Sequence, residues 1–383
     1  MAINRTGLLY DQRFLAHMTG DESVVITREK TFHLSPAPHP SSSFLIQRTK
    51  EFLDGSGLSA HLHTLFSRAA TLDEITTYHT QEYVAGMHEC AVNGPMIGPF
   101  TRSWGFVDED TVISPGSYEA ALYSVGGALN AVQATLNGEV HNAYALLRPP
   151  GHHAMSNQAL GFCMFNNVAL AAHYARRTFG VERIMIIDWD VHHGNGTQDA
   201  FYSDPGVLFI SLHQENWFPS HAGTLEDSGS DKGIGYNVNV PLPPGTGDRG
   251  YLAAFDQLIA PLGQLYRPEL ILVSNGVDAC WLDPLAQMMM TMDGYRQLTL
   301  RVVALAEELC GGRIVLLHEG GYSVPYVPYC TAATIEALSG IDLGIVDLYA
   351  TSSELARCQE IYSPATQDAL QAARETYMHW WKL

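Results

Sequence analysis

From about residue 118 onward, short apolar runs alternate with longer segments in which apolar residues recur every three to four positions. The longer segments have the period of amphipathic helices, and the short runs are typical of strands buried on both faces. Helices are predicted at 118–138, 163–180, 251–266 and 293–312, and strands at 144–148, 183–190, 207–213, 269–276 and 313–318. This alternation predicts an α/β protein with a mostly parallel sheet covered by helices on both faces.

The chain is predicted to form one domain over residues 1–383, because no internal repeat or low-complexity linker divides it. A hydrophobic fraction of 46% is enough for a large core. Residues 20–43 are polar and rich in Pro and Ser, so we expect a long loop at the site entrance or against a neighbouring subunit. Residues 341–383 are predicted to be a C-terminal extension packed on the domain.

The charge balance narrows the possible partners. The 21 Lys and Arg residues against 40 Asp and Glu residues give a net charge of −19, which disfavours direct binding to nucleic acid. No run of about 18 apolar residues could span a membrane, and the N-terminus lacks the apolar core of a signal peptide. We therefore expect a cytoplasmic enzyme with reduced, mostly buried cysteines.

Four polar clusters follow four of the predicted strands, at 149–153, 188–196, 275–279 and 319–322. The carboxyl ends of parallel strands meet at one edge of a sheet, which is where open α/β sheets place their ligands. The sequence therefore predicts a single site at the C-terminal ends of the strands.

One of these clusters carries the ligand types of a transition metal. Asp188, Asp190 and His192 alternate along the end of the strand at 183–190, so their side chains are predicted to share one face. Oxygen and imidazole ligands suit an ion such as zinc. A polar strand end that bonds its own loop is the alternative. Asp278 favours the metal, because a carboxylate leaving an apolar strand needs a partner or an ion.

The other clusters carry candidate catalytic groups. His152 and His153 follow a stiff Arg-Pro-Pro-Gly segment and suit general acid–base work near neutral pH, although either alone could simply bond backbone. Tyr322, after two glycines, could donate a hydrogen bond to a developing oxyanion or could serve as a packing residue. Phe162 and Phe218 could wall a channel or belong to the core.

These residues occur in motifs that resemble a known family. RPPGHHA, GFCMFNN, DWDVHHGNGTQ, SLHQ, NGVDA followed by DPL, and HEGGY stand in the order and spacing of the histone deacetylase superfamily. HHGNGTQ is similar to class II-type members and to the bacterial histone-deacetylase-like amidohydrolases. The resemblance extends from about Thr6 to about Gly340. It implies the arginase/deacetylase fold with one catalytic zinc ion.

The resemblance implies a role for each matching position. The zinc ligands would be Asp190, His192 and Asp278, and the catalytic residues would be His152, His153 and Tyr322. Asp188 and Asn195 would orient the two histidines. A structural potassium ion would be bound by Asp188, Asp190, His192, Ser211 and Leu212, and a second, weaker cation site would use Phe201, Asp204, Val207 and Tyr236. The substrate channel would be lined by Gly161, Phe162, Phe218, Leu285 and the rim carboxylate Asp110.

Two departures from the family pattern concern neighbours of these groups. Asn195 stands where class I members carry a second histidine-orienting Asp. Class II-type members also have Asn here, so the residue fits that subgroup but leaves His153 less strongly polarised. Val277 and Cys280 are unusual in the NGVDAC segment but do not replace a ligand.

The expected reaction is zinc-dependent hydrolysis of an acetyl amide, which releases acetate and a free amine from an acetyl-lysine-like substrate. An acetylpolyamine or a small amide or ester would fit the same channel, and the acidic charge favours cationic substrates. Asp21, Glu22 and Glu29 could narrow the entrance for a polyamine. Two other functions are the alternatives. A ureohydrolase with two metals would need a further ligand such as Asp283. A non-catalytic binder of acylated amines would not need Tyr322 as an oxyanion donor. Because relatives of this type tend to be oligomers, the resemblance also implies a homo-oligomer, either a dimer or a tetramer.

Overall fold

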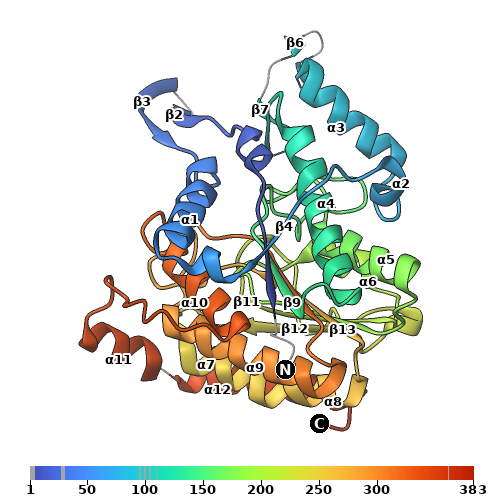
Figure 1. Ribbon diagram of the computed structural model, residues 1–383, viewed down its shortest axis with the longest axis vertical. Helices are drawn as coiled ribbons and strands as arrows, with labels where there is room; N and C mark the ends of the chain where they lie inside the picture. The colour runs from blue at the N-terminus through green and yellow to red at the C-terminus, as the bar shows by residue number, and fades with distance from the viewer. Residues whose placement is uncertain are drawn as a thin grey trace.

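A computed structural model describes residues 5–26, 31–94, 96–98, 101–102, 105–108, 110–360 and 362–383. Within these residues the centre of the molecule is a sheet of eight strands, all parallel (Figure 1). The strands lie in the order β12-β11-β10-β13-β14-β9-β1-β4. In chain order they are β1 (Thr6–Leu9), β4 (His63–Leu65), β9 (Asn142–Ala145), β10 (Ile184–Asp188), β11 (Val207–Gln214), β12 (Asn237–Leu242), β13 (Leu270–Asn275) and β14 (Ile314–His318).

Helices cover both faces of this sheet. On one face α4 and α5 pack together, and on the other lie α9 and α10 (Figure 1). The α-helices are α1 (Ser43–Gly55), α2 (Leu72–Ile75), α3 (Gln81–Asn93), α4 (Ser117–Leu136), α5 (Asn167–Phe179), α6 (Asn195–Phe201), α7 (Asp248–Ala254), α8 (Ala260–Tyr266), α9 (Met292–Cys310), α10 (Val327–Ser339), α11 (Ser352–Glu360) and α12 (Pro364–Tyr377). Three 3₁₀ turns occur at η1 (Gln12–Ala16), η2 (Leu58–His61) and η3 (Asp231–Gly233).

The central strands explain the continuous apolar runs of the sequence. Every residue of β10, β11, β13 and β14 is buried, because helices cover both faces. The predicted fold class is therefore confirmed, with a sheet that is wholly parallel in the described part of the chain. None of the described helices is long and apolar enough to cross a bilayer.

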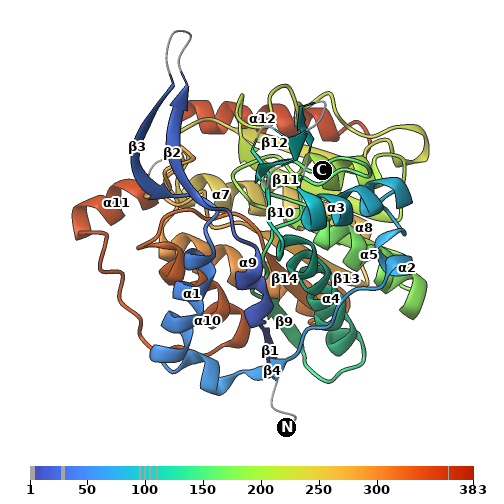
Figure 2. The same ribbon diagram turned by 90° about the horizontal axis from the view of Figure 1, so that it is seen from above.

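The segment at 20–43 differs from the predicted long loop. It contains an antiparallel hairpin of β2 (Asp21–Ile26) and β3 (Thr31–Pro38), which projects from the body of the molecule (Figure 2). The loop prediction was wrong because it rested on the Pro and Ser content of the segment. It gave too little weight to the β-branched Val-Val-Ile-Thr run, which favours a strand. Asp21 and Glu22 lie on β2, and Glu29 lies outside the described residues.

Two shorter antiparallel pairs precede α4 in the chain. They are β5 (Met96–Gly98) with β6 (Thr101–Arg102), and β7 (Gly105–Phe106) with β8 (Val112–Ile113). At the other end of the chain, Leu370 and Ala373 of α12 are buried. Tyr377 ties the same helix to β12, because its hydroxyl accepts the N–H of Asn239 at 2.7 Å.

Three predicted boundaries were wrong. The helix expected at 163–180 begins at Asn167, because the Asn166 side chain caps it by accepting the Ala169 N–H at 2.9 Å. The helix expected at 251–266 is split into α7, a π-helical segment η4 (Phe255–Ile259) and α8, because Pro261 has no N–H to continue the regular ladder. The strand expected at 183–190 ends at Asp188.

Candidate metal and catalytic site

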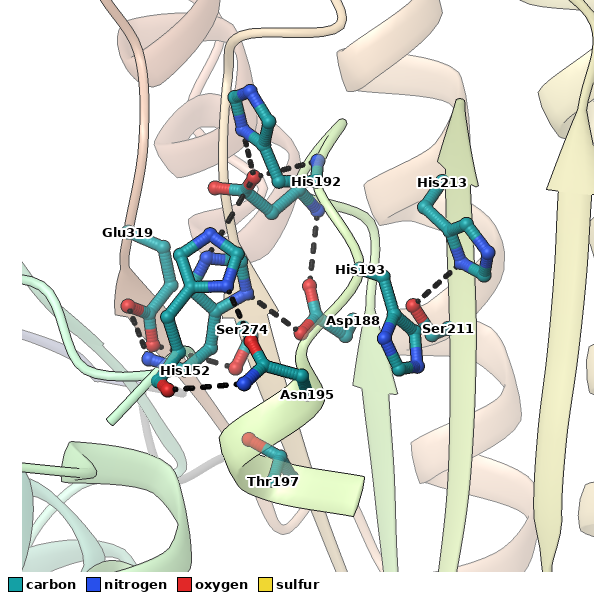
Figure 3. A network of polar contacts seen from close by, with 12 residues as sticks. His152, Asp188, His192, His193, Asn195, Thr197, Ser211, His213, Ser274 and Glu319 are labelled. Atoms are coloured by element: carbon teal, nitrogen blue, oxygen red, sulfur yellow. Dashed lines mark hydrogen bonds and ion pairs between the residues drawn. The ribbon is translucent and has the colours of Figure 1, made fainter. Parts of the chain in front are cut away.

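The four polar clusters lie at one edge of the sheet. They follow β10, β13, β14 and β9, which are consecutive neighbours in the sheet order. Figure 3 shows His152, Asp188, His192 and Glu319, which come from three of these clusters, close together in one network of polar contacts. The tertiary structure thus brings together residues that are up to 170 positions apart, as strand topology predicted.

Asp190, His192 and Asp278 form a buried cluster of possible metal ligands, with their ligand atoms within 4.8 Å of one another. The His192 Nδ1 atom lies 3.1 Å from Oδ1 of Asp190 and 3.1 Å from Oδ2 of Asp278. Asp190 and His192 lie in the loop after β10, so the predicted alternation along a strand is wrong. The loop turns both side chains to the same centre instead.

Backbone amides hold the two carboxylates of this cluster in place. The N–H of Gly320 donates to Oδ2 of Asp190, and the N–H of Val191 donates to Oδ1 of Asp278, both at 2.8 Å. A Cβ atom at Gly320 would come within 2.3 Å of Asp278 Oδ2, so any larger residue would collide with the cluster. The sequence shows two glycines before Tyr322, but this close approach of Gly320 to the carboxylates was not predicted from it.

The cluster fits a zinc ion. Ligand atoms bound tetrahedrally at about 2.0–2.2 Å are separated from each other by about 3.3 Å, close to the 3.1 Å separations of this cluster. Asp190 and Asp278 are fully buried and carry like charges, which favours a cation between them. A single imidazole with two carboxylates is a three-ligand set that leaves a position for water or substrate.

His152 is buried beside two carboxylates. Its Nδ1 atom lies 3.0 Å from Oδ2 of Asp188, and Asp188 in turn accepts the N–H of Asp190 at 3.1 Å. Burial alone would lower the pKa of His152, but the charges of Asp190 and Asp188 outweigh burial and raise this pKa to about 10. In the protein alone, His152 therefore favours its protonated form.

His153 has the opposite tendency. Its Nδ1 atom lies 2.8 Å from Oδ1 of Asn195, a neutral partner at the first residue of α6. Burial, and then the nearby rings of His152 and His192, lower the pKa of His153 well below its usual range. The neutral ring lies against Gly161, where a Cβ atom would come within 2.2 Å of its Cδ2 atom. His153 is thus available to accept a proton.

Tyr322 reaches the same centre from the loop after β14. Its hydroxyl oxygen would be 3.0 Å from a Cβ atom at Gly320, which places the phenol beside the carboxylates of Asp190 and Asp278. Burial and these two carboxylates raise the pKa of Tyr322 further above its usual value. The hydroxyl therefore keeps its proton and remains a hydrogen-bond donor.

Two aromatic rings enclose the cluster. Phe218 packs edge-on against His153 at a ring-centroid distance of 5.1 Å, and Phe162 packs against Tyr322 at 5.7 Å. Phe162 has a φ angle of +66°, which is unusual for a residue with a side chain and is typical of functional sites. His39, at the end of the hairpin, packs edge-on against Phe162 at 5.1 Å. No pattern in the sequence indicated the position of His39.

Asp110 and Leu285 lie in loops that support this wall. Oδ1 of Asp110 accepts the N–H of Gly161 at 3.0 Å, next to Phe162. Burial, and then the neighbouring Asp108, raise the pKa of Asp110 to about 6. The carbonyl of Leu285 accepts the indole N–H of Trp217 at 2.8 Å, next to Phe218 in the sequence.

The residues expected at the two cation sites are connected mainly by strand register and backbone hydrogen bonds. Asp188 of β10 pairs in register with Ser211 of β11, and the Ser211 hydroxyl is 3.0 Å from His213 Nδ1. Around the second site, backbone hydrogen bonds run from Asp204 to Phe201, from Val207 to Asp204 and from Phe209 to Tyr236. The Asp204 carboxylate there forms an ion pair with Arg176, whose charge opposes a cation at its side chain. Leu212 follows Ser211 on β11, and Asp190 and His192 lie in the loop after β10.

Two buried charged residues of the site were not predicted. Oε2 of Glu319 accepts the N–H groups of Gly151 and His152 at 2.6 and 3.2 Å, so it fixes the backbone that carries the histidine pair. Arg148 donates to the carbonyls of Phe14, His17 and Ser41 beneath this loop. The signal in the sequence was a charged residue directly beside an apolar run, which the HEGGY and RPPGHH motifs contain.

The fold and the site define a hydrolase of the arginase/deacetylase type, with a buried Asp-His-Asp cluster, a histidine pair and a tyrosine at the carboxyl edge of a parallel sheet. The model of the histone deacetylase domain matches residues 39–338. The chain belongs to the histone deacetylase family.

Known proteins agree with this assignment over most of the chain. The histone deacetylase-like amidohydrolase of Pseudomonas aeruginosa is 41% identical over 344 residues, which cover 90% of this chain and 88% of that protein. Histone deacetylase 8 of Arabidopsis thaliana is 35% identical over 88% of this chain and 89% of its own. The crystal structure of the HDA15 HD domain superposes with a TM-score of 0.84 at 30% identity, covering 100% of this chain and 96% of that structure.

Proposed function

We propose that this protein is a zinc-dependent amidohydrolase that removes an acetyl group from a linear acylated amine, producing acetate and the free amine. The observation that carries the proposal is the buried cluster of Asp190, His192 and Asp278 beside two histidines, of which His152 faces the Asp188 carboxylate and His153 the neutral amide of Asn195. Membership of a deacetylase family supports hydrolysis of an acyl amide.

Asp190, His192 and Asp278 would hold one zinc ion. Bound there, zinc would act as a Lewis acid on the acyl carbonyl and on a water molecule. The three ligands leave room for substrate, and the histidine pair, Tyr322 and the aromatic rings lie around that position.

The remaining steps fall to the protein's own groups. His153, which faces the neutral Asn195, accepts the proton of the attacking water, while His152 is held by the carboxylate of Asp188. Tyr322 donates a hydrogen bond to the oxyanion that develops on the carbonyl oxygen. The carbonyl of Gly161 accepts the amide N–H, and a protonated histidine then delivers the proton to the departing amine. Phe162 and Phe218 grip the straight chain of the substrate and exclude water.

The alternatives fit the site less well. In a binuclear ureohydrolase, Asp283 would have to turn to the metal, but both of its oxygens accept backbone N–H groups, those of Leu285 and Tyr322. A non-catalytic binder would have no use for a proton acceptor and an oxyanion donor around one carbonyl. Structural potassium at Asp188 and Ser211, a cytoplasmic location and a homo-oligomeric assembly remain predictions from the sequence.

The substrate class is tested by steady-state kinetics on the zinc-loaded protein, with acetyl-lysine peptides, acetylated polyamines and a small acetanilide. We expect turnover of an acyl amine, with the highest kcat/KM on a cationic substrate because the chain carries a net charge of −19. A higher kcat/KM on the polyamine or on the small amide would identify that compound class, rather than acetyl-lysine, as the natural substrate. Zinc-loaded protein that hydrolyses none of the three would contradict the proposed function.

A further inference from the structure

The Asp-Pro-Leu motif at 283–285 joins two loops of the site. Oδ2 of Asp283 accepts the N–H of Tyr322 at 2.8 Å, and Oδ1 accepts the N–H of Leu285 at 2.9 Å. The residue is 8% exposed, so water does not readily replace either bond. One carboxylate therefore fixes both the backbone of the oxyanion donor and the loop that carries Leu285.

The same contacts extend to the channel wall. The carbonyl of Leu285 accepts the indole N–H of Trp217 at 2.8 Å, and Trp217 precedes Phe218, whose ring packs against His153 and His192. The N–H of Asp283 donates to the carbonyl of Cys280 at 3.0 Å, which closes its own turn. A continuous set of bonds thus runs from the Tyr322 backbone through Asp283 to the aromatic wall.

Tyr322 needs such support because its own loop is permissive. Gly320 and Gly321 precede it, and Gly321 has a φ angle of +151°. Glycines leave the backbone many conformations, so the position of the phenol depends on contacts outside the loop. The hydrogen bond from the Tyr322 N–H to Asp283 is such a contact, and a shift of about 1 Å in a catalytic group can cost about 100-fold in rate.

We propose that Asp283 is a positioning residue for the reaction, which sets Tyr322 against the substrate carbonyl and couples it to the channel wall at Leu285 and Trp217. This inference rests on the proposed function, in which Tyr322 stabilises the oxyanion. It assigns Asp283 no contact with the metal or with substrate.

The test is Asp283→Asn in the zinc-loaded, full-length protein. An amide of the same size has one carbonyl oxygen and one NH₂ group, so one of the two backbone N–H groups loses its acceptor. We expect kcat on an acetyl-lysine reporter to fall about 10- to 100-fold, with KM changed less than about threefold and one zinc still bound per chain. Asp248→Asn is the control, because Asp248 is 3% exposed and accepts the N–H and hydroxyl of Thr291 outside the site.

A double-mutant cycle separates positioning from general loss of structure. In a Tyr322→Phe background, Asp283→Asn should lower kcat less than about threefold further, because the donor that it positions is gone. An equal loss in both backgrounds, loss of zinc, or an unchanged kcat in folded Asp283→Asn would each overturn the inference. If Asp283→Asn does not fold, Asp283→Glu, which keeps the carboxyl group but moves its oxygens by one methylene, is measured in the same way.

Amide hydrogen exchange gives a readout that does not depend on activity. Peptides that span residues 283–287 and 320–326 cover the two N–H groups, and at least one of these peptides should take up deuterium faster in Asp283→Asn than in the wild type or in Asp248→Asn. Unchanged exchange there would contradict the inference. If the wild type hydrolyses no acyl amine, the proposed function fails on its own, and the exchange result still decides whether Asp283 holds the Tyr322 loop.

Discussion

The Nδ1 atom of His153 lies 2.8 Å from the side-chain oxygen of Asn195, a neutral partner, whereas the adjacent His152 faces the carboxylate of Asp188. The two imidazole rings are tilted by 43° to each other at a centroid distance of 3.9 Å. This difference between their partners, together with the repulsion between the rings, sets one histidine to hold a proton and the other to accept one.

Asn195→Asp should move the acid side of the pH–activity profile. A carboxylate at this position favours protonated His153, so its pKa rises and the neutral form is lost at a higher pH. We expect the acid limb of kcat/KM to shift upward by about one to two pH units. The control is Asn137→Asp, which adds the same charge at an exposed position at the end of α4. An unchanged acid limb would show that His153 is not the titrating base.

Tyr322→Phe should reduce turnover while leaving the metal in place. Loss of one oxyanion donor costs about 10²- to 10³-fold in kcat. Zinc content and KM should stay within about threefold of the wild type, because the hydroxyl is not a ligand. Tyr349→Phe, which alters a phenol that is 39% exposed, is the control. Near-wild-type kcat in the Tyr322 variant would refute the assigned role.

Metal analysis should find one zinc ion per chain. Asp278→Asn removes the charge of a fully buried ligand, so we expect zinc affinity to fall at least tenfold and activity to fall with it. Dialysis against a chelator should abolish turnover, and added zinc should restore it. Asp256→Asn, an exposed carboxylate paired with Arg301, should bind zinc normally. Two tightly bound metal ions per chain would favour the ureohydrolase alternative.

Acid should destabilise the fold through buried neutral histidines. Burial lowers the pKa of His79 to about 4, and its Nε2 atom accepts the N–H of Asn166 at the start of α5. Between pH 6.5 and about 4 the unfolded chain binds the proton that folded His79 does not, so the free energy of unfolding falls as pH falls through this range. The full difference corresponds to about 3 kcal/mol.

Denaturant unfolding at pH 7 and pH 5 tests this contribution. His79→Gln keeps a side-chain acceptor for the Asn166 N–H but cannot be protonated, so its stability should fall less between the two pH values than that of the wild type. His61→Gln, at an exposed position, should behave like the wild type. An equal pH dependence in all three proteins would contradict the prediction.

The strand pattern and the fold class could be predicted from the chain because parallel strands covered on both faces are continuously apolar. The runs at 269–276 and 313–318 correspond to β13 and β14, and both are completely buried. The hairpin at β2 and β3 was missed because the Pro and Ser residues of 20–43 indicated a loop, although the short Val-Val-Ile-Thr run favours a strand.

The residues of the site could also be predicted from the sequence, but their geometry could be predicted only in part. Short motifs after apolar runs located Asp190, His192 and Asp278, and the resemblance to deacetylases suggested their roles. The argument that Asp190 alternates with Asp188 along a strand was wrong, because the strand ends at Asp188 and the loop sets the direction of each side chain.

The sequence by itself determined which elements form and which polar residues leave the sheet at its carboxyl edge, since hydrophobic period and local motifs are properties of neighbouring residues. Only the tertiary structure decided the partner of each buried charge. Asp283 is near Asp278 in the chain, yet it accepts the backbone N–H of Tyr322 rather than joining the metal cluster. Glu319 likewise supports the backbone of His152. Such pairings depend on how separate loops pack together, and burial then makes each of them obligatory.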